Sequence, residues 1–254
     1  MIAASSRLTN GQVQQYNEQG FLVVPNLLSE LEIKAFIGAE TGWKDKKFGL
    51  HGHTCDPQYS HLATHPNIAG SAMQLLNGRV RIVQTMYLDK SPQGGRGVAL
   101  HQDSLYLPND PNTLMACWLA LTDTDSDNGG LCVVPGSHRL GLQKWHKNLN
   151  DKEHDSWEHE HEFRDRDGRT WKQTLCSFEI DGIKQMNIVR LTVPRGAGVF
   201  FTGLTIHGSF ANTTPNRPRK AFAIHYVHEN TWLSRTDVQN TMPVELEAES
   251  AKCR

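Results

Sequence analysis

The sequence predicts a single, mainly β domain with helical additions, built from antiparallel strands that form a jelly roll or a barrel. The chain has 254 residues, of which 38% are hydrophobic and 21% are charged, enough to bury one large core. Short β-rich runs separated by turn residues follow Arg79, whereas the helical spacing of apolar residues is confined to the residues before it. Neither an internal repeat nor a linker divides the chain. We therefore expect one domain over 1–254, with a helical cap at 1–78, a β core at 79–228 and a C-terminal tail at 229–254.

Capping residues predict the helices of the N-terminal cap. Thr9 or Asn10 is placed to cap a first helix that runs to residue 19. Ser29 opens a second helix, and Glu32 stands where it completes a capping box with that serine. The other elements expected in the cap are a strand over 21–24, which a proline ends, and a helix over 66–76.

The β core is predicted from apolar runs bounded by proline, glycine and asparagine, which are the residues that tight turns prefer. Clusters of these turn residues occur at 91–95 and at 127–130. The strands expected between such turns cover 80–88, 98–103, 114–122, 131–134, 188–193, 198–201 and 220–227.

A polar segment, 140–185, interrupts these strands and is called the insert below. A stretch of this length within a compact domain is usually functional, and three tryptophans and Phe178 give it apolar anchors. We expect the insert to form a lid or pocket wall that decides substrate choice. Its tract Glu158–Glu162 alternates glutamate with histidine, which favours a solvated face over a second metal site.

Charge and cysteine content argue against several classes of protein. The 26 lysines and arginines nearly balance the 27 acidic residues, so no strong field attracts nucleic acid or an anionic membrane. Residues 1–12 are polar, and no uncharged apolar run approaches the roughly 20 residues that span a bilayer. Five cysteines without a C-x-x-C pair argue against a disulfide framework. These features predict a cytoplasmic protein that binds neither nucleic acid nor membrane, and they leave its oligomeric state open.

Thirteen histidines are the unusual feature of the composition, because histidine is the commonest metal ligand. His101 and Asp103 stand at i and i+2 at the end of a predicted strand, where both side chains point to one face. This pair alone is weak evidence, since chance gives roughly one His-x-acid pair in a chain of this composition. His207, between two predicted strands, supplies a third ligand. Two histidines and one carboxylate form the facial triad of ferrous iron, whereas zinc prefers a third histidine, a cysteine or a closed shell.

The run 217–227 alternates as a strand with two different faces. One face carries Arg219, Ala221, Ala223 and His225, and is small except for the cation at its end. An arginine fork beside two alanines suits bidentate capture of a small carboxylate, with space for its carbon chain. Arg217 and Lys220 are expected to be solvated instead.

Several further motifs occur in a fixed order along the chain. They are Leu8–Val13 with Gly20–Pro25, Gln84–Tyr87, His101–Asp103, Asn128–Leu131, Pro135–His138, His207–Ser209 and Arg219–Ala221. In this order they resemble the motifs of the phytanoyl-CoA dioxygenase-like family of iron and 2-oxoglutarate-dependent oxygenases. The resemblance covers most of the chain, and the combination is specific where each motif alone is not.

The resemblance implies a double-stranded β-helix, a cupin-like jelly roll, in which His101, Asp103 and His207 hold Fe(II). Arg219 would pair with the distal carboxylate of 2-oxoglutarate, which is the cosubstrate together with O2. Other positions that contact the cosubstrate or line its pocket in the family correspond to Gln84, Gln102, Trp118 and Ser209. The implied activity is hydroxylation of an unactivated carbon of a small molecule, with release of succinate and CO2. Related halogenases replace the carboxylate ligand by a small residue, so Asp103 favours hydroxylation.

Two other interpretations stay open at the level of the sequence. A cupin-like metal-binding protein could act as a non-oxidative hydrolase or isomerase, or only bind a ligand, but it would have no need for a cation such as Arg219 opposite the metal. A scaffold that has lost catalysis conflicts with an intact set of four residues. The sequence does not identify the substrate, because members of the family oxidise acyl-CoA esters, amino acids and diverse natural products.

Overall fold

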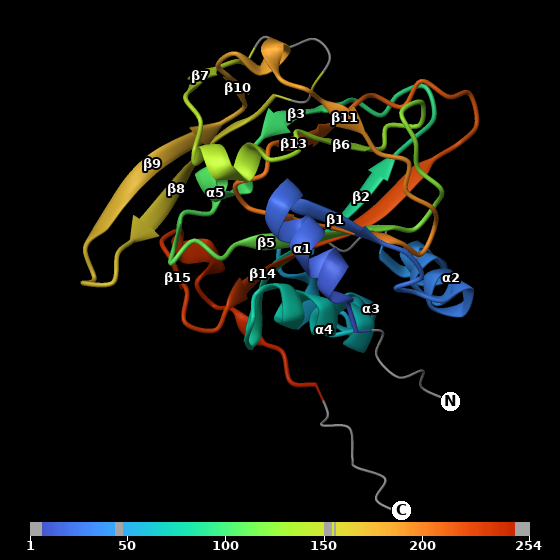
Figure 1. The fold of residues 1–254 in the computed structure, drawn as a ribbon, viewed down its shortest axis with the longest axis horizontal. Helices are drawn as coiled ribbons and strands as arrows, with labels where there is room; N and C mark the ends of the chain where they lie inside the picture. Colours follow the sequence, from blue (N-terminus) through green and yellow to red (C-terminus); the bar gives the residue numbers. More distant parts are fainter. Residues whose placement is uncertain (1–6, 44–47, 150–153, 155, 247–254) are drawn as a thin grey trace, which may run out of the picture.

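The fold consists of two antiparallel β-sheets that enclose a shared core, with helices covering the outer face of the larger sheet (Figure 1). The computed structural model describes residues 7–43, 48–149, 154 and 156–246. The larger sheet has the strand order β1 (Phe21–Val24), β12 (Gly198–Thr202), β5 (Met115–Ala120), β14 (Arg219–His228), β2 (Val80–Lys90) and β16 (Met242–Pro243). The smaller sheet has the order β11 (Val189–Arg190), β6 (Leu131–Val133), β13 (His207–Ser209) and β3 (Val98–His101). This mainly β jelly-roll core confirms the predicted fold class.

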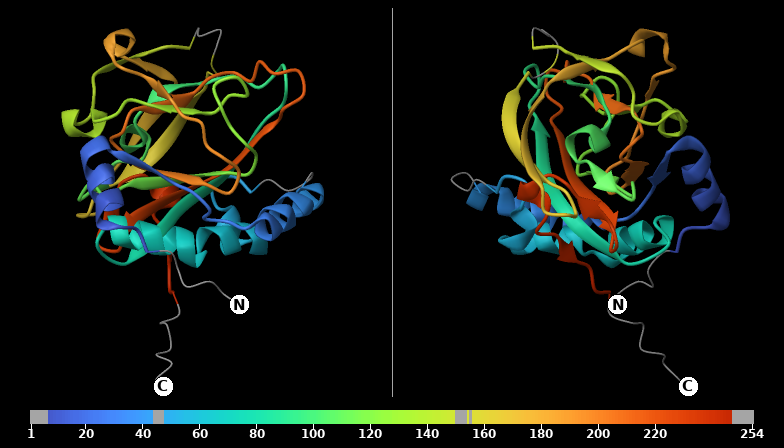
Figure 2. Two further views of the ribbon diagram at one scale, coloured as in Figure 1. Left: turned by 45° about the vertical axis from the view of Figure 1, so that its right-hand side comes forward. Right: turned by 90° about the vertical axis from the view of Figure 1, so that its left-hand side faces the viewer.

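Most of the N-terminal helices form a layer below the larger sheet, and the first helix stands at its side, next to the strand that follows it (Figure 2). The helices are α1 (Asn10–Gln19), α2 (Glu30–Ala39), α3 (Pro57–Ala63) and α4 (Pro66–Leu75), with 3-10 turns η1 (Glu40–Trp43) and η2 (Gly52–Thr54) between them. The predicted capping box of Ser29 and Glu32 is present at the start of α2, and Thr9, one of the two predicted caps of α1, forms a second capping box with Gln12. The helix α3, which Asp56 caps, was not predicted from the sequence. Among the described helices, none has the length and apolar character needed to cross a membrane.

Gly20 ends α1 in the left-handed conformation, with φ of 78°. A Cβ at this position would lie 2.3 Å from Nδ1 of His138 and 2.7 Å from Oγ1 of Thr205. The turn therefore needs glycine both for its backbone angle and for the close packing of α1 against the loop before β13.

Strand β14 separates the two halves of the core. Phe222, Ile224 and Tyr226 point toward the helices and belong to the larger hydrophobic cluster, which the helices cover. Ala221 and Ala223 point into the space between the sheets, where the facing side chains belong to the second cluster. The predicted alternation of this strand is confirmed, and its small face opens space inside the jelly roll.

The insert contains strands rather than an irregular loop. It holds β7 (Trp145–Lys147), β8 (Glu158–Arg164), β9 (Thr170–Cys176) and β10 (Phe178–Ile180), flanked by η3 (Ser137–Leu140) and η4 (Ile183–Gln185). Strands β8 and β9 form a twisted hairpin that projects beside the jelly roll (Figure 1). This hairpin is tied to the segment 232–239, because Arg164 N–H donates to the Ser234 carbonyl at 2.7 Å and Trp232 Nε1 donates to the Arg164 carbonyl at 3.0 Å. The remaining short elements are α5 (Asp103–Tyr106), β4 (Asn109–Asp110), β15 (Trp232–Leu233) and η5 (Thr236–Val238).

Candidate metal centre and cavity

The three predicted metal ligands meet at one end of the smaller sheet. His101 is the last residue of β3 and His207 is the first residue of β13, and the two pair directly in the register of these strands. Directly paired residues project to the same face, which brings their ring centroids within 4.3 Å. The expected strand over 98–103 ends early, at His101, and Asp103 begins α5 instead. The chain turns here because Ser104 N–H donates to the Gly203 carbonyl and Leu107 N–H to the Asp103 carbonyl.

The geometry of these ligands suits one metal ion. Their ligand atoms all lie within 4.8 Å of one another. Asp103 Oδ1 is 3.4 Å from His101 Nε2 and 3.6 Å from His207 Nε2. Nδ1 of His101 donates to the Ala99 carbonyl at 2.8 Å, and Nδ1 of His207 donates to the Thr205 carbonyl at 3.0 Å. Because a carbonyl can only accept, these bonds fix the tautomer that leaves both Nε2 atoms free to bind a metal.

Burial and mutual charge shift the pKa values of these ligands. Burial lowers the pKa of His207 to about 4, so this imidazole is neutral near pH 7, as metal binding requires. Burial alone would raise the pKa of Asp103, but His207, His225 and His101 outweigh it and hold this pKa well below its ordinary value. Burial also opposes the charged form of His101, whose hydrogen bond to Asp103 nevertheless raises its pKa. The site therefore presents an ionised carboxylate between two imidazoles.

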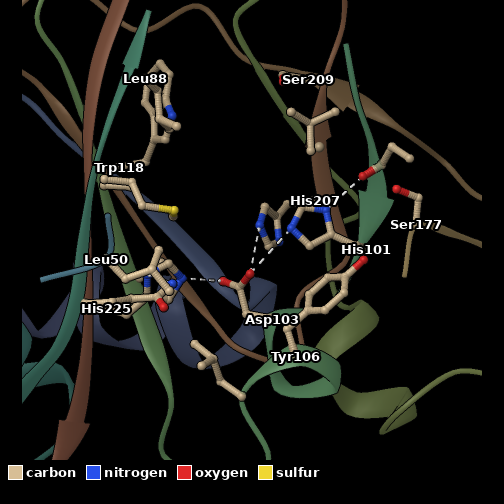
Figure 3. A pocket seen from close by; sticks show the side chains of 18 of the residues that line it. Leu50, Leu88, His101, Asp103, Tyr106, Trp118, Ser177, His207, Ser209 and His225 are labelled. Carbon is tan, nitrogen blue, oxygen red and sulfur yellow. Dashed lines mark hydrogen bonds and ion pairs between the residues drawn. The ribbon is translucent and has the colours of Figure 1, made fainter. Parts of the chain in front are cut away.

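A third histidine, which the sequence analysis placed on the right face but gave no role, holds Asp103 in place. His225 on β14 is 3% exposed, and its Nε2 lies 3.0 Å from Asp103 Oδ2 (Figure 3). Its Nδ1 lies 3.3 Å from Nε2 of Gln84 on the neighbouring strand β2. An amide nitrogen can only donate, so Nδ1 accepts and Nε2 carries the proton that it donates to Asp103. This leaves Oδ1, the other carboxylate oxygen, facing the two ligand histidines.

Arg219 lies inside the cavity, as the parity of β14 predicts. Its side chain is buried, Nε donates to the Gly129 carbonyl at 3.2 Å, and Nη1 donates to the Leu88 carbonyl at 3.1 Å. Burial lowers its pKa to about 10, which still leaves it charged near pH 7. Among the residues that the structure describes, no carboxylate lies within ion-pair distance of this guanidinium. Arg217, by contrast, is exposed and pairs with Asp125 at 2.6 Å.

The other predicted pocket residues divide into two groups. Trp118, Gln84 and Ser209 line the same cavity as Arg219, and the guanidinium lies 5.8 Å from the Trp118 ring centroid. The structure places Gln102 elsewhere. Its amide nitrogen donates to the carbonyls of Gly141 and Leu204, and its oxygen accepts from Gln143 N–H. These hydrogen bonds engage the whole amide of Gln102. The side chain therefore holds the beginning of the insert, at Gly141 and Gln143, and does not line the cavity.

A buried lysine, which was not predicted from the sequence, lies beside the arginine. Lys90 is directly opposite Arg219 in the pairing of β2 with β14. Its Nζ donates to Ser209 Oγ at 2.8 Å and to the Phe210 carbonyl at 2.6 Å. This lysine fixes the Ser209 hydroxyl at the wall of the cavity, although nothing in the local sequence marks it as an inward-facing residue.

The cavity has a volume of about 460 Å³ and extends from Arg219 past the triad to the insert. Its inner half lies between the two sheets, where small residues such as Ala116 and Ala223 leave the space. Its outer half is lined by Tyr106 of α5 and by residues of the insert, including Trp157, His159, His161 and Phe178. In the tract Glu158–Glu162 the two histidines border the cavity, but His159 is exposed like the glutamates and only His161 is partly buried. Most of this tract is therefore exposed to solvent.

A jelly roll that presents two histidines and a carboxylate inside its cavity defines a facial-triad metalloprotein. The chain belongs to the phytanoyl-CoA dioxygenase family, whose model matches residues 16–221. It is similar to phytanoyl-CoA dioxygenase of Arabidopsis thaliana, with 27% identity over 205 residues, which cover 78% of this chain and 65% of the relative. It is also 27% identical to ectoine dioxygenase of Bordetella bronchiseptica over 255 residues, covering 88% and 77% of the two chains. This chain spans just under two thirds of the length of the plant relatives.

Solved structures share the fold. The carbocyclase SnoK from nogalamycin biosynthesis, a non-haem α-ketoglutarate-dependent enzyme, superposes with a TM-score of 0.69 at 24% identity over 91% of this chain and 88% of its own. EctD from S. alaskensis, with 2-oxoglutarate and 5-hydroxyectoine, superposes with a TM-score of 0.64 at 19% identity over 90% and 78%. These likenesses place the strands of this chain in the same architecture.

Proposed function

We propose that this protein is an Fe(II)- and 2-oxoglutarate-dependent dioxygenase that hydroxylates an unactivated carbon of a small molecule and releases succinate and CO2. The observation that carries the proposal is the joint presence, in one cavity, of the His101–Asp103–His207 triad and the buried guanidinium of Arg219. Membership of the phytanoyl-CoA dioxygenase family supports it.

The donor set fits ferrous iron. Two imidazole nitrogens and one carboxylate oxygen gather on one side, which is the arrangement that leaves neighbouring positions open on non-haem iron. When bound, the iron would activate O2 and couple the oxidation of 2-oxoglutarate to the oxidation of the substrate. His101, Asp103 and His207 would hold it, with both imidazoles already in the tautomer that presents Nε2.

The chain's own residues would bind and orient the cosubstrate. Arg219 offers a charged fork inside the cavity, which its two backbone hydrogen bonds hold in place. It would bind the distal carboxylate of 2-oxoglutarate by charge-assisted hydrogen bonds, with Ser209 and Trp118 beside it. Gln84 would act through His225 on Asp103. A non-oxidative cupin would have no use for such a fixed cation, which favours the oxygenase.

We also propose that the insert forms the outer wall of the cavity and decides which substrate enters. Five residues between 157 and 178 line the cavity, so the insert reaches the space next to the triad. Its hairpin is held by a backbone hydrogen bond to Ser234 and by a hydrogen bond from the Trp232 indole, which supports a role as a wall fixed at one side.

The test is reconstitution under anaerobic conditions. Adding 2-oxoglutarate to the Fe(II)-loaded protein should produce a weak visible charge-transfer band, and O2 should then yield succinate in a substrate-dependent manner. Asp103→Ala should abolish the band and the turnover, whereas Asp181→Ala, on the surface of the insert, should change neither. The proposal would be overturned if the unmodified, iron-loaded protein bound 2-oxoglutarate no more tightly than the Asp103→Ala variant.

A screen of acyl-CoA esters, amino acids and natural products for stimulated succinate formation would then identify the substrate class. His101→Ala and His207→Ala should weaken iron binding without unfolding the chain. Near-normal activity of either variant under limiting iron would remove that residue from the ligand set.

A further inference from the structure

The buried lysine opposite Arg219 is connected to the cavity through a serine. Lys90 is 6% exposed and continues the inward face of β2 after Met86 and Leu88, which line the cavity, but Lys90 itself does not line it. Its Nζ donates to Ser209 Oγ at 2.8 Å and to the Phe210 carbonyl at 2.6 Å. Ser209 does belong to the cavity wall, so it links the ammonium group to the space that a ligand would occupy.

The hydrogen bond from Lys90 determines what the Ser209 hydroxyl can do. An ammonium group can only donate, so Ser209 Oγ is the acceptor and its own hydrogen is not used in this contact. Among the described residues, no acceptor for that hydrogen is found. The hydroxyl therefore remains a donor at the cavity wall, and a carboxylate oxygen is the acceptor that suits it.

This serine lies at the same end of the cavity as Arg219. Figure 3 shows Leu88 and Ser209 at one end of the pocket, with Asp103 at the other. Nη1 of Arg219 donates to the Leu88 carbonyl at 3.1 Å, and Lys90 is directly opposite Arg219 in the pairing of β2 with β14. A carboxylate bound by the guanidinium would therefore lie at the end of the cavity that the serine lines.

Two glycines allow the chain to close around the stem of Lys90. A Cβ at Gly95 would lie 2.6 Å from Cβ of Lys90, and a Cβ at Gly129 would lie 3.0 Å from its Cδ and 2.9 Å from the Phe210 carbonyl oxygen. The carbonyl of Gly129, whose φ is 83°, also accepts the hydrogen bond from Arg219 Nε. One turn thus packs on the lysine and holds the arginine, which restricts both side chains before a ligand arrives.

We propose that Lys90 is a positioning residue of the cosubstrate site: it occupies a lone pair of Ser209 Oγ, so that the hydroxyl donates to the same carboxylate that Arg219 binds. The inference rests on the proposed function, because this carboxylate is the distal one of 2-oxoglutarate. Without the ammonium group the hydroxyl would be free to rotate away from the ligand. Lys90 acts through Ser209 and makes no contact of its own with the carboxylate, so the two residues form one unit.

A double-mutant cycle tests this coupling. The full chain is loaded with Fe(II) under anaerobic conditions, and the affinity for 2-oxoglutarate is measured by titrating the visible charge-transfer band. Lys90→Met and Ser209→Ala should each weaken binding by about 3- to 10-fold, as expected for the loss of one hydrogen bond to a charged group. The double variant should lie within about twofold of the single variant that binds less tightly, because both changes remove the same hydrogen bond.

Two controls separate this effect from a general disturbance of the cavity. 2-Oxobutyrate carries the same keto acid group but lacks the distal carboxylate, so its affinity should stay within about twofold in all four proteins. Lys220→Met removes a lysine next to Arg219 on β14 that is bound to Glu40 on the opposite face of the sheet. It removes the same charge and should leave the affinity for 2-oxoglutarate within about twofold of the unmodified protein.

The inference would be overturned if the effects of Lys90→Met and Ser209→Ala multiplied in the double variant, or if Lys220→Met weakened binding as much as Lys90→Met. If Lys90→Met does not fold, Ser209→Ala decides: an unchanged affinity overturns the inference, and a loss confined to 2-oxoglutarate supports it. A protein in which Arg219→Ala weakens binding but Ser209→Ala does not would refute this inference alone. An unmodified, iron-loaded protein that does not bind 2-oxoglutarate would instead refute the proposed function.

Discussion

Replacing Arg219 by alanine should weaken 2-oxoglutarate binding by about 10- to 100-fold. The guanidinium is 3% exposed, charged near pH 7, and held by two backbone carbonyls, so it is already oriented before a carboxylate arrives. A hydrogen bond to a charged group contributes about 1.5 to 3 kcal/mol, and each 1.4 kcal/mol is about tenfold in affinity. Because no protein carboxylate competes for Arg219 among the described residues, most of this energy is available to a ligand.

Isothermal titration of 2-oxoglutarate into the Mn(II)-loaded protein under anaerobic conditions measures this loss directly. Arg217→Ala is the matched control, since that arginine lies two residues away but is exposed and paired with Asp125. It should leave the affinity for 2-oxoglutarate unchanged, and Arg219→Lys should fall between the two because an ammonium keeps the charge but loses the fork. If Arg217→Ala and Arg219→Ala weakened binding equally, the assignment of the anchor to the inward face of β14 would be wrong.

Three further predictions concern other parts of the molecule. His225→Phe should weaken metal binding by about tenfold, as measured by equilibrium dialysis, because Asp103 loses the hydrogen bond that orients it. The hydrogen bond from Arg217 lowers the pKa of Asp125 from 3.8 to about 2, so the pair stabilises the fold above about pH 4 and this contribution is lost as the pH falls through about 2. Both side chains are partly exposed, so the effect on acid unfolding is small. Trimming the insert to a short turn should preserve uncoupled 2-oxoglutarate turnover and abolish its stimulation by substrate.

Each of these has its own control. His228→Phe changes a histidine at the end of the same strand that does not line the cavity, and it should leave the metal affinity unaltered. Asp125→Asn should flatten the acid limb of the stability curve below pH 4, and an unchanged limb would show that the pair does not contribute. Unaltered substrate kinetics in the trimmed protein would refute a role for the insert in substrate choice.

The sequence predicted those helices and strands whose ends or faces are determined by residues close together in the chain. The capping boxes at Thr9 and Ser29 involve partners three positions away, so the starts of α1 and α2 were predicted correctly. The alternation of β14 was equally visible, because one of its faces is bulky and the other is small. The hairpin β8–β9 was missed, because most of its side chains are exposed and it lacks the apolar alternation that marks a half-buried strand.

Contacts between distant parts of the chain explain the remaining differences at the site. His225 binds Asp103, which is 122 positions earlier, and Gln102 is engaged by Leu204, which is 102 positions later. Lys90 reaches Ser209 across 119 positions. No pattern within a short window distinguishes these side chains from others of their type, so their roles emerge only when the sheets have formed.

The division of the cavity between two structural units has a consequence for how its two halves can change. The metal ligands lie on α5 and on strands of the jelly roll, whereas Trp157, His159 and His161 lie on or just before a hairpin strand outside both main sheets. Mutations in the hairpin can alter the shape of the outer cavity while the positions of the ligands stay fixed by the register of β3 and β13. Under the proposed function, changes in the hairpin would alter substrate preference while the triad keeps its geometry.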